Sequence, residues 1–169
     1  MKYPILKLSF LLLIWVLMMN GCQSDDHLNS EDWFRRGLAS EKATDYGKAV
    51  KAYTKALEIN PHYAKVYQHR GTAWSKQNDY DQAIIDFTEA IRLNPRNAEV
   101  YNLRGMVWIC KNMNDPAMVD FTKAIEVNPR YAEAFYNRGV ILSRKGYYDQ
   151  AIDNFTKALE IDSFYADAY

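Results

Sequence analysis

The stretch AKVYQHRGTAWSKQNDYDQAIIDFTEAIRLNP, residues 64–95, contains two amphipathic segments joined by a short polar turn. In both segments apolar residues recur three and four positions apart, which is the spacing of one face of an α-helix. This spacing predicts a helix over residues 64–76 and a second over 80–93, with Asn78 or Asp79 as the cap between them. Asn94-Pro95 ends the second helix, because proline disfavours helical geometry in the residue before it. The stretch is therefore predicted to be a helical hairpin.

The same pattern recurs every 34 residues on both sides of this stretch. Four columns hold in all four copies: glycine at 37, 71, 105 and 139; alanine at 49, 83, 117 and 151 and again at 56, 90, 124 and 158; and an aromatic residue at 53, 87, 121 and 155. Proline follows at 61, 95 and 129, with Ser163 in the fourth copy. One such hairpin cannot bury its own apolar face, so the copies are expected to stack.

The order of Trp or Tyr, Gly, Ala, an aromatic residue, Ala and Pro resembles the tetratricopeptide repeat family. The resemblance covers residues 30–165 and implies an all-α, right-handed α-solenoid of helix-turn-helix repeats. The implied repeats are residues 30–63, 64–97, 98–131 and 132–165, and residues 166–169 match the start of a truncated fifth. It also implies a non-enzymatic protein whose concave groove binds a protein or peptide partner.

Two details of the repeats carry structural predictions. A glycine inside a helix costs about 1 kcal/mol relative to alanine. Four in phase therefore predict a close approach between helices, with the aromatic column filling the adjacent space. Repeat three differs from the others by its Asn114-Asp115-Pro116 sequence. With Asp115 as a cap and Pro116 in the first turn, its second helix is expected to start late and its hairpin to pack more loosely.

The first 22 residues have the organisation of a targeting segment. Lys2 and Lys7 are followed by an apolar run over residues 8–19 that only Ser9 interrupts. The run is too short to span a bilayer and has the length of a signal-peptide core. Gly21-Cys22 comes directly after it and resembles the lipobox of bacterial lipoproteins, although Met19 and Asn20 depart from the usual residues.

That resemblance implies a signal peptide over residues 1–21, a lipidated Cys22 and a flexible tether over residues 22–29. It places the protein in a bacterial cell envelope, attached to the membrane through its lipid. Gln23 after the cysteine favours the periplasmic face of the outer membrane. The alternative is an uncut N-terminal anchor in which Cys22 has no role.

In the tetratricopeptide family the groove is lined by the first helix of each repeat. The resemblance implies ten partner-binding residues: Phe34, Leu38, His69, Asn102, Leu103, Met106, Ile109, Tyr136, Asn137 and Val140. Repeat three has an apolar stripe along its first helix, made up of Leu103, Met106, Ile109 and Cys110. This stripe suits an amphipathic helix or an extended peptide, unless a neighbouring helix buries it. Members that clamp the C-terminal carboxylate of a chaperone use Lys and Asn where this chain has Phe34 and Leu38, which argues against that partner class.

Composition and the remaining residues argue against other functions. Lys plus Arg equals Asp plus Glu, 21 each, so there is no basic excess for nucleic acid. The three histidines have no ligand spacing to Cys or carboxylate residues, so neither a metal nor another cofactor is predicted. Cys110 is expected to be a small buried hydrophobic residue. An arginine precedes each repeat glycine, and these arginines are expected to pair with carboxylates rather than form an anion-binding rail.

These observations predict a membrane-anchored scaffold that takes part in envelope assembly. A structural, self-assembling solenoid and an accessory domain of a longer protein remain alternatives. The last predicted helix has apolar residues that would pack against a further repeat: Ile152, Phe155, Leu159 and Ile161. Only Ala166–Tyr169 of that repeat follow, so the C-terminal end is expected to self-associate or to be covered by another subunit or partner.

Overall fold

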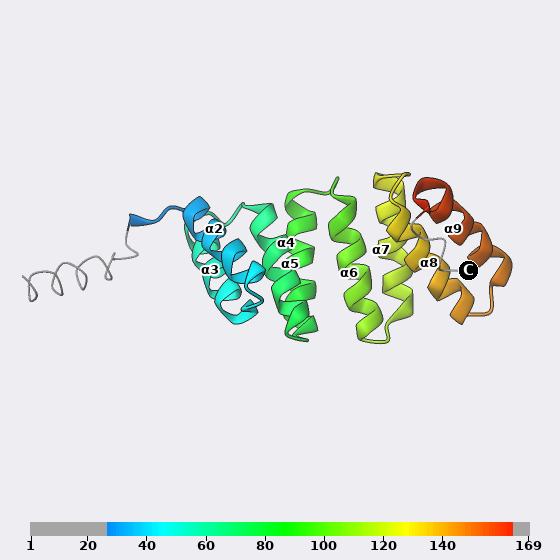
Figure 1. Cartoon of the computed structure of the whole chain (residues 1–169), viewed down its shortest axis with the longest axis horizontal. Helices are drawn as coiled ribbons and strands as arrows, with labels where there is room; N and C mark the ends of the chain where they lie inside the picture. Colours follow the sequence, from blue (N-terminus) through cyan, green and yellow to red (C-terminus); the bar gives the residue numbers. More distant parts are fainter. Residues whose placement is uncertain (1–26, 164–169) are drawn as a thin grey trace, which may run out of the picture.

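The computed structural model describes residues 27–163, which form eight helices arranged as four hairpins (Figure 1). The helices are α2 (Ser30–Lys42), α3 (Tyr46–Ile59), α4 (Ala64–Lys76), α5 (Tyr80–Leu93), α6 (Ala98–Cys110), α7 (Asn114–Val127), α8 (Ala132–Arg144) and α9 (Tyr148–Ile161). The bounds predicted for the second copy agree with α4 and α5 residue for residue. The all-α, four-hairpin architecture expected from the sequence is confirmed.

The hairpins stand side by side along the long axis of the molecule, as Figure 1 shows. The first helices of the repeats contact one another in sequence: α2 with α4, α4 with α6, and α6 with α8. Among residues 27–163, no comparably extensive contact joins successive second helices, α3, α5, α7 and α9. The first helices are therefore more closely spaced and form the inner, concave face, while the second helices form the outer face.

The turn inside each repeat is a Schellman turn that ends the first helix. In α4, the N–H of Asn78 donates to the carbonyl of Ser75 and the N–H of Asp79 to that of Trp74, both at 3.0 Å. Asn78 takes the left-handed conformation, with φ of 63°, and Asp79 caps α5 by accepting from the N–H of Gln82 at 3.4 Å. The two residues that the sequence offered as alternative caps thus have separate roles.

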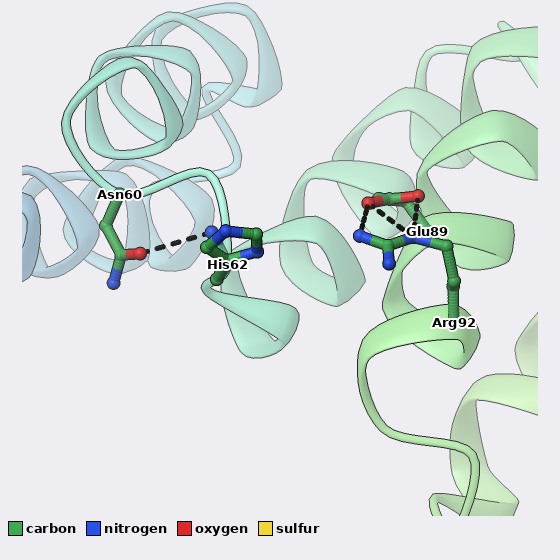
Figure 2. A network of polar contacts seen from close by, with 4 residues as sticks. All are labelled: Asn60, His62, Glu89 and Arg92. Carbon is green, nitrogen blue, oxygen red and sulfur yellow. Dashed lines mark hydrogen bonds and ion pairs between the residues drawn. The ribbon is translucent and has the colours of Figure 1, made fainter.

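Asparagine organises the connection between repeats. The side-chain oxygen of Asn60 accepts from the backbone N–H of His62 at 3.1 Å (Figure 2). The same bond recurs in the two later connections, where the backbone N–H of Arg96 donates to Asn94 and that of Arg130 donates to Asn128. Such Asx turns reverse the chain without help from distant residues, so the local sequence sets the offset between repeats.

Figure 2 also shows the Glu89–Arg92 ion pair on the surface of α5. The Arg92 guanidinium donates to both carboxylate oxygens at 2.6–3.0 Å. These bonds lower the pKa of Glu89. Because both side chains lie on the surface of one helix, the pair contributes little to the free energy of folding.

A glycine–aromatic contact joins the two helices of each repeat. A Cβ atom built on Gly105 would lie 2.6 Å from Cε1 of Phe121, and the other three repeat glycines give 2.2–2.9 Å to the aromatic residue of their own repeat. The helices therefore approach as closely as the glycine column predicts. Tyr53, Phe87 and Phe121 are completely buried in this position and form the centre of the core.

Repeat three is more regular than its sequence predicts. α7 begins at Asn114, in the same register as the other second helices, so the expected late start is wrong. Pro116 is the third residue of the helix, where its missing N–H would have no intrahelical partner in any case. Phe121 is fully buried, which contradicts the expected looser packing. What this repeat lacks is a side-chain cap, because Met113 stands where Asp79 caps α5.

The predictions made for residues 1–26 and 164–169 lie outside the described residues. They include the signal peptide, Cys22, most of the tether and the start of a fifth repeat. Within residues 27–163, no helix combines the length and the apolarity needed to cross a bilayer.

Candidate functional site

The arginine before a repeat glycine ties two successive second helices together. Arg70 on α4 donates from Nε and Nη2 to the two carboxylate oxygens of Asp86, both at 2.8 Å, and from Nη1 to the Thr54 hydroxyl at 3.0 Å. Arg104 makes the same contacts with Asp120 and Thr88. Arg138 donates once to Asn154, from Nε at 2.8 Å, and once to the Thr122 hydroxyl at 3.3 Å. The predicted pairing with carboxylates is confirmed in repeats two and three, whereas the partner of Arg138 in repeat four is the Asn154 amide. In repeat one, Ala52 occupies the aspartate position and Arg36 stacks on Trp33 at 4.9 Å.

At repeat one, the concave face is filled by the chain's own side chains. Phe34 is 3% exposed, and its ring lies 5.4 Å from that of Tyr63 and 5.3 Å from that of His69. Leu38 packs against the same buried cluster. Phe34 was predicted to contact a partner, but it is a core residue, because the rings of Tyr63 and of His69 in the following repeat cover it.

His69 belongs to a polar network at this end of the groove. Its Nδ1 lies 3.1 Å from Oε2 of Glu41, which also accepts from the Tyr53 hydroxyl at 2.5 Å. Burial and the hydrogen bond to Glu41 raise the pKa of Tyr53, so the phenol stays protonated and donates. His69 is half-buried, and its ring is held by these contacts and by Phe34.

The middle of the groove is closed by amide side chains. Asn102 is 0% exposed, and its Oδ1 accepts from Nδ2 of Asn137 at 2.9 Å. Its own amide nitrogen lies 3.7 Å from Sδ of Met106. Leu103 is half-buried against the cluster around Phe87. Asn102 and Leu103 therefore support the groove from beneath, and the prediction that they contact a partner does not fit their burial.

An open apolar hollow lies farther along the concave face, between α6 and α8. Its volume is about 280 Å³. Five residues supply its apolar wall and rim, and we call them the groove patch: Met106, Ile109, Cys110, Tyr136 and Val140. Met106 is 41% exposed. Of the ten predicted binding residues, the structure brings five to this hollow: Met106, Ile109, Tyr136, Asn137 and Val140.

Cys110 is more exposed than the sequence predicts. It was expected to be buried, but it is an exposed free cysteine at the end of α6. Partial desolvation, together with the charge and hydrogen bonding of Cys110, raises the pKa of Tyr80 on α5. The thiol therefore lies at the junction of the groove patch with the preceding repeat.

Three further residues complete the hollow. Phe121 and Ile141 form its floor, and Arg144 lies on its rim. The repeat columns identify Phe121 as a core residue, but they do not show that this buried side chain also underlies a hollow. In the part of the chain that the structure describes, no group of three His, Cys, Asp or Glu residues is placed to hold a metal ion.

The fold and the groove can be compared with known structures. The crystal structure of MamA superposes with a TM-score of 0.77 at 26% identity, covering 82% of this chain and 81% of that one. The Arabidopsis OM64 TPR domain gives 0.66 at 27% identity, covering 68% and 95%. YrrB, described as a TPR protein with an unusual peptide-binding site, gives 0.71 at 24% identity, covering 83% and 72%, and at that identity it supports the fold alone. A comparison with curated protein sequences finds no match.

Sequence models of the tetratricopeptide repeat match residues 30–63, 64–97 and 132–165. Repeat three, residues 98–131, is not among these segments, although α6 and α7 have the same lengths as the corresponding helices of the other repeats. The matched repeats, the helix register and the superposed structures agree: this chain belongs to the tetratricopeptide repeat family, whose members are non-enzymatic scaffolds for protein–protein interaction.

Proposed function

We propose that the groove patch binds one apolar face of an amphipathic helix or extended peptide from a partner protein. The observation that carries this proposal is the exposure of Met106 over an open, apolar hollow on the concave face. An exposed methionine in a monomer leaves apolar area in water, and its flexible thioether adapts to different apolar side chains. At repeat one the groove is filled by Phe34 and its neighbours, and the apolar hollow lies at repeats three and four, so the partner is expected to engage those two repeats.

The polar residues at the rim of the hollow would orient a bound partner segment. Arg144 supplies a positive charge to the lining of the hollow, and Asn137 supplies an amide. Asn137 is held by Asn102 from beneath, so its position is set before a partner arrives. A partner with an apolar residue followed by an acidic one would satisfy both the floor and the rim.

Crosslinking from the patch tests this proposal. A photoreactive residue at position 106 or 136, followed by mass spectrometry, should capture a partner in cells. Met106→Glu should weaken the binding of that partner by about tenfold or more, because a charge would enter an apolar contact. Its thermal unfolding should change little. Val119→Glu on the outer face, where Val119 is also exposed, should leave binding unchanged. A large fall in the melting temperature of Met106→Glu would show that the patch is core and would remove the proposal's main support.

We also propose that lipid on Cys22 anchors the scaffold to an envelope membrane, where it takes part in envelope assembly. The support is the short apolar run followed directly by Gly21-Cys22. Diacylation gives firm anchoring, whereas a single chain binds only marginally. Cys22→Ala should abolish incorporation of labelled palmitate and release the protein from membranes, while Cys110→Ala should affect neither. A Cys22→Ala chain that still incorporates label would contradict lipidation at this residue.

Self-association through α9 is a second candidate, and a specific observation favours it. Ile152 is 51% exposed, whereas Val50 at the same position of repeat one is 7% exposed. Ile152→Glu should reduce any concentration-dependent mass in sedimentation, and Val119→Glu should not. Identical sedimentation of both variants and the unchanged chain would remove this candidate.

A further inference from the structure

The outward face of α9 is exposed, whereas the same face of the earlier second helices is covered. In repeats one to three the first helix of the next repeat packs on this face: α4 on α3, α6 on α5 and α8 on α7. On α9 the face contains four apolar residues, which we call the α9 seam: Tyr148, Ile152, Phe155 and Leu159. Tyr148 is 66% and Ile152 51% exposed. No further helix follows α9 among residues 27–163, and the seam leaves apolar area in contact with water.

Repeat one shows how the fold covers these four positions. They are occupied there by Tyr46, Val50, Tyr53 and Leu57, which share one apolar cluster with residues of α4. Val66 and Ala73 belong to this cluster from the side of α4, and both are fully buried. Only residues 60–63 connect α3 to α4, so the covering helix runs antiparallel to the helix that it covers. An apolar, antiparallel helix is therefore the kind of partner that suits the α9 seam.

The N-terminal end of the same chain does not present such a helix. Asp32 and Ala39 of α2 stand at the positions that Val66 and Ala73 occupy in α4. The Asp32 carboxylate accepts a backbone N–H at 3.4 Å in the capping box of α2, and Ala39 is exposed. Packing α2 of a second copy onto the α9 seam would place this carboxylate where the fold elsewhere buries Val66, which costs free energy. Head-to-tail stacking of copies is therefore disfavoured.

α9 itself presents a suitable apolar helix. The four seam residues are separated by four, three and four positions, which is the spacing of side chains that interlock between two packed helices. This spacing reads the same in both directions along the helix. In an antiparallel pair of α9 helices, Tyr148 of one copy therefore lies opposite Leu159 of the other, and Ile152 lies opposite Phe155. Both contacts occur twice, related by a two-fold axis.

Charge favours the antiparallel direction over the parallel one. The first half of α9 contains two exposed acidic residues, Asp149 and Asp153. The second half contains Lys157 and Glu160, which form an exposed ion pair at 3.1 Å, so this half is neutral. A parallel pair would set the two acidic halves side by side, whereas an antiparallel pair sets each acidic half beside a neutral one and avoids the repulsion.

We propose that α9 of a second copy of this chain covers the α9 seam, in an antiparallel pair with two-fold symmetry. The proposal rests on the self-association candidate above and adds the face and the direction of the contact. Each seam covers the other, so association ends at two copies and does not grow into a filament.

The pair would also bring two binding sites into one assembly. The ring of Tyr136, which lines the groove patch, lies 5.7 Å from the ring of Phe155, which belongs to the seam. The two groove patches would therefore lie close to the contact, while the α2 ends, at the far end of each array, point away from it (Figure 1). A partner with two apolar segments would gain affinity by binding both patches.

Cysteine crosslinking in the full chain tests this geometry, with Cys22→Ala and Cys110→Ser removing its own two thiols. Tyr148→Cys and Leu159→Cys chains are oxidised separately and as a mixture. The mixture should give a disulfide-linked dimer, and neither variant alone should. Positions 148 and 159 lie three turns apart along one helix, about 16 Å, which is too far for a disulfide between two identical positions of the antiparallel pair. Linking of either variant with itself, but not in the mixture, would indicate a parallel pair and overturn the proposal.

A second pair of variants keeps the test decisive if Leu159→Cys disturbs folding. Position 152 lies beside the proposed axis, so a short bismaleimide should link Ile152→Cys chains to one another. It should not link them to Ala39→Cys chains. In head-to-tail stacking these two positions would meet, because Val50 and Ala73 share one cluster inside the array. A link between the Ile152→Cys and Ala39→Cys chains would therefore overturn the proposal.

Sedimentation of the unchanged chain separates the possible failures. The largest species should have the mass of two chains, and Ile152→Glu should abolish it. Association that persists with an Ile152–Ala39 link would keep the self-association candidate and remove this geometry. A monomer at every concentration would remove both. Met106→Glu should leave the crosslinking unchanged, so the groove proposal stands or falls independently.

Discussion

Arg138 donates from Nε to the side-chain oxygen of Asn154 at 2.8 Å, in the position where Arg70 and Arg104 each hold an aspartate. Repeat four thus has a neutral amide in place of the buried carboxylate and keeps one of the two hydrogen bonds. Burial lowers the pKa of Arg138, which has no carboxylate in this position to oppose the desolvation. Burial likewise raises the pKa of Asp86 in spite of its bonds to Arg70. Desolvation therefore offsets much of the attraction, and the hydrogen-bond geometry is the main gain from the contact.

This relationship predicts that removing Arg70 and neutralising Asp86 cost different amounts of unfolding free energy. Arg70→Ala would leave the Asp86 carboxylate, 2% exposed, without its counter-charge, and should cost about 3–5 kcal/mol of unfolding free energy. Asp86→Asn keeps an acceptor of the same shape, as Asn154 does, and should cost about 1 kcal/mol or less. Urea unfolding at neutral pH measures both. Equal losses in the two variants would contradict the argument.

The same pair predicts a pH dependence. Because the pKa of Asp86 is raised in the folded state, the folded chain binds its proton more tightly than the unfolded chain does. The resulting stabilisation is complete below the unfolded pKa, near 3.8, and is lost as pH rises through the folded pKa. Asp86→Asn should remove this decline, so the difference in stability between the variant and the unchanged chain should shift in the variant's favour as pH rises across that window. A difference that is constant with pH would show that the burial of Asp86 has no such effect.

The contact between Gly105 and Phe121 predicts opposite effects of one substitution at two glycines. Gly105→Ala places a Cβ 2.6 Å from the Phe121 ring and should destabilise repeat three by about 1–3 kcal/mol. Gly47→Ala is the control, since its Cβ would meet only Asp45 Oδ1 at 3.8 Å. It should stabilise the chain by about 0.5–1 kcal/mol, because alanine suits a helix better than glycine. Phe121→Leu should recover part of the loss in Gly105→Ala, and full additivity of the two changes would contradict a steric cause.

Thr44 holds the left-handed position that Asn78, Asn112 and Gly146 hold in the other repeats, with φ of 58°. A β-branched residue is strained in this conformation, whereas asparagine and glycine tolerate it. Thr44→Asn should therefore raise the unfolding free energy by about 1 kcal/mol, and Asn78→Thr should lower it by a similar amount. Thermal melts of the two single variants measure the effect. A loss of stability in Thr44→Asn would indicate that the Thr44 hydroxyl, which donates to the Ala43 carbonyl at 2.7 Å, matters more than the backbone strain.

The exposed thiol of Cys110 predicts a probe of groove occupancy. A maleimide should label Cys110 fully under native conditions, whereas a buried cysteine would react only when the chain unfolds. Partner bound at the groove patch should slow this labelling by about tenfold or more, because Cys110 lines the hollow. Cys110→Ser separates this signal from any reaction at Cys22. Labelling that is equally fast with saturating partner would place the partner elsewhere on the scaffold.

Much of the architecture follows from the sequence, because it depends on local patterns. The ends of α4 and α5 are set by a Schellman turn and an Asn-Pro step, and both act within a few residues. The glycine and aromatic columns predict the contact inside each hairpin, since both partners lie in one repeat. The error at Pro116 arose because a proline is compatible with the whole first turn of a helix and does not by itself define where the helix starts.

Which side chains are accessible on the concave face could be decided only from the tertiary structure. Phe34 and Met106 both lie on first helices that line the concave face, yet the rings of Tyr63 and His69 bury one while the other remains exposed over a hollow. Accessibility depends on the side chains that neighbouring repeats bring alongside, and no pattern within one repeat contains that information. The same reason explains why Cys110 is exposed. The sequence by itself determined the repeats, their helices and the contact inside each hairpin, because these are local. Only the packing between repeats decided which side chains fill the groove and which remain open to a partner.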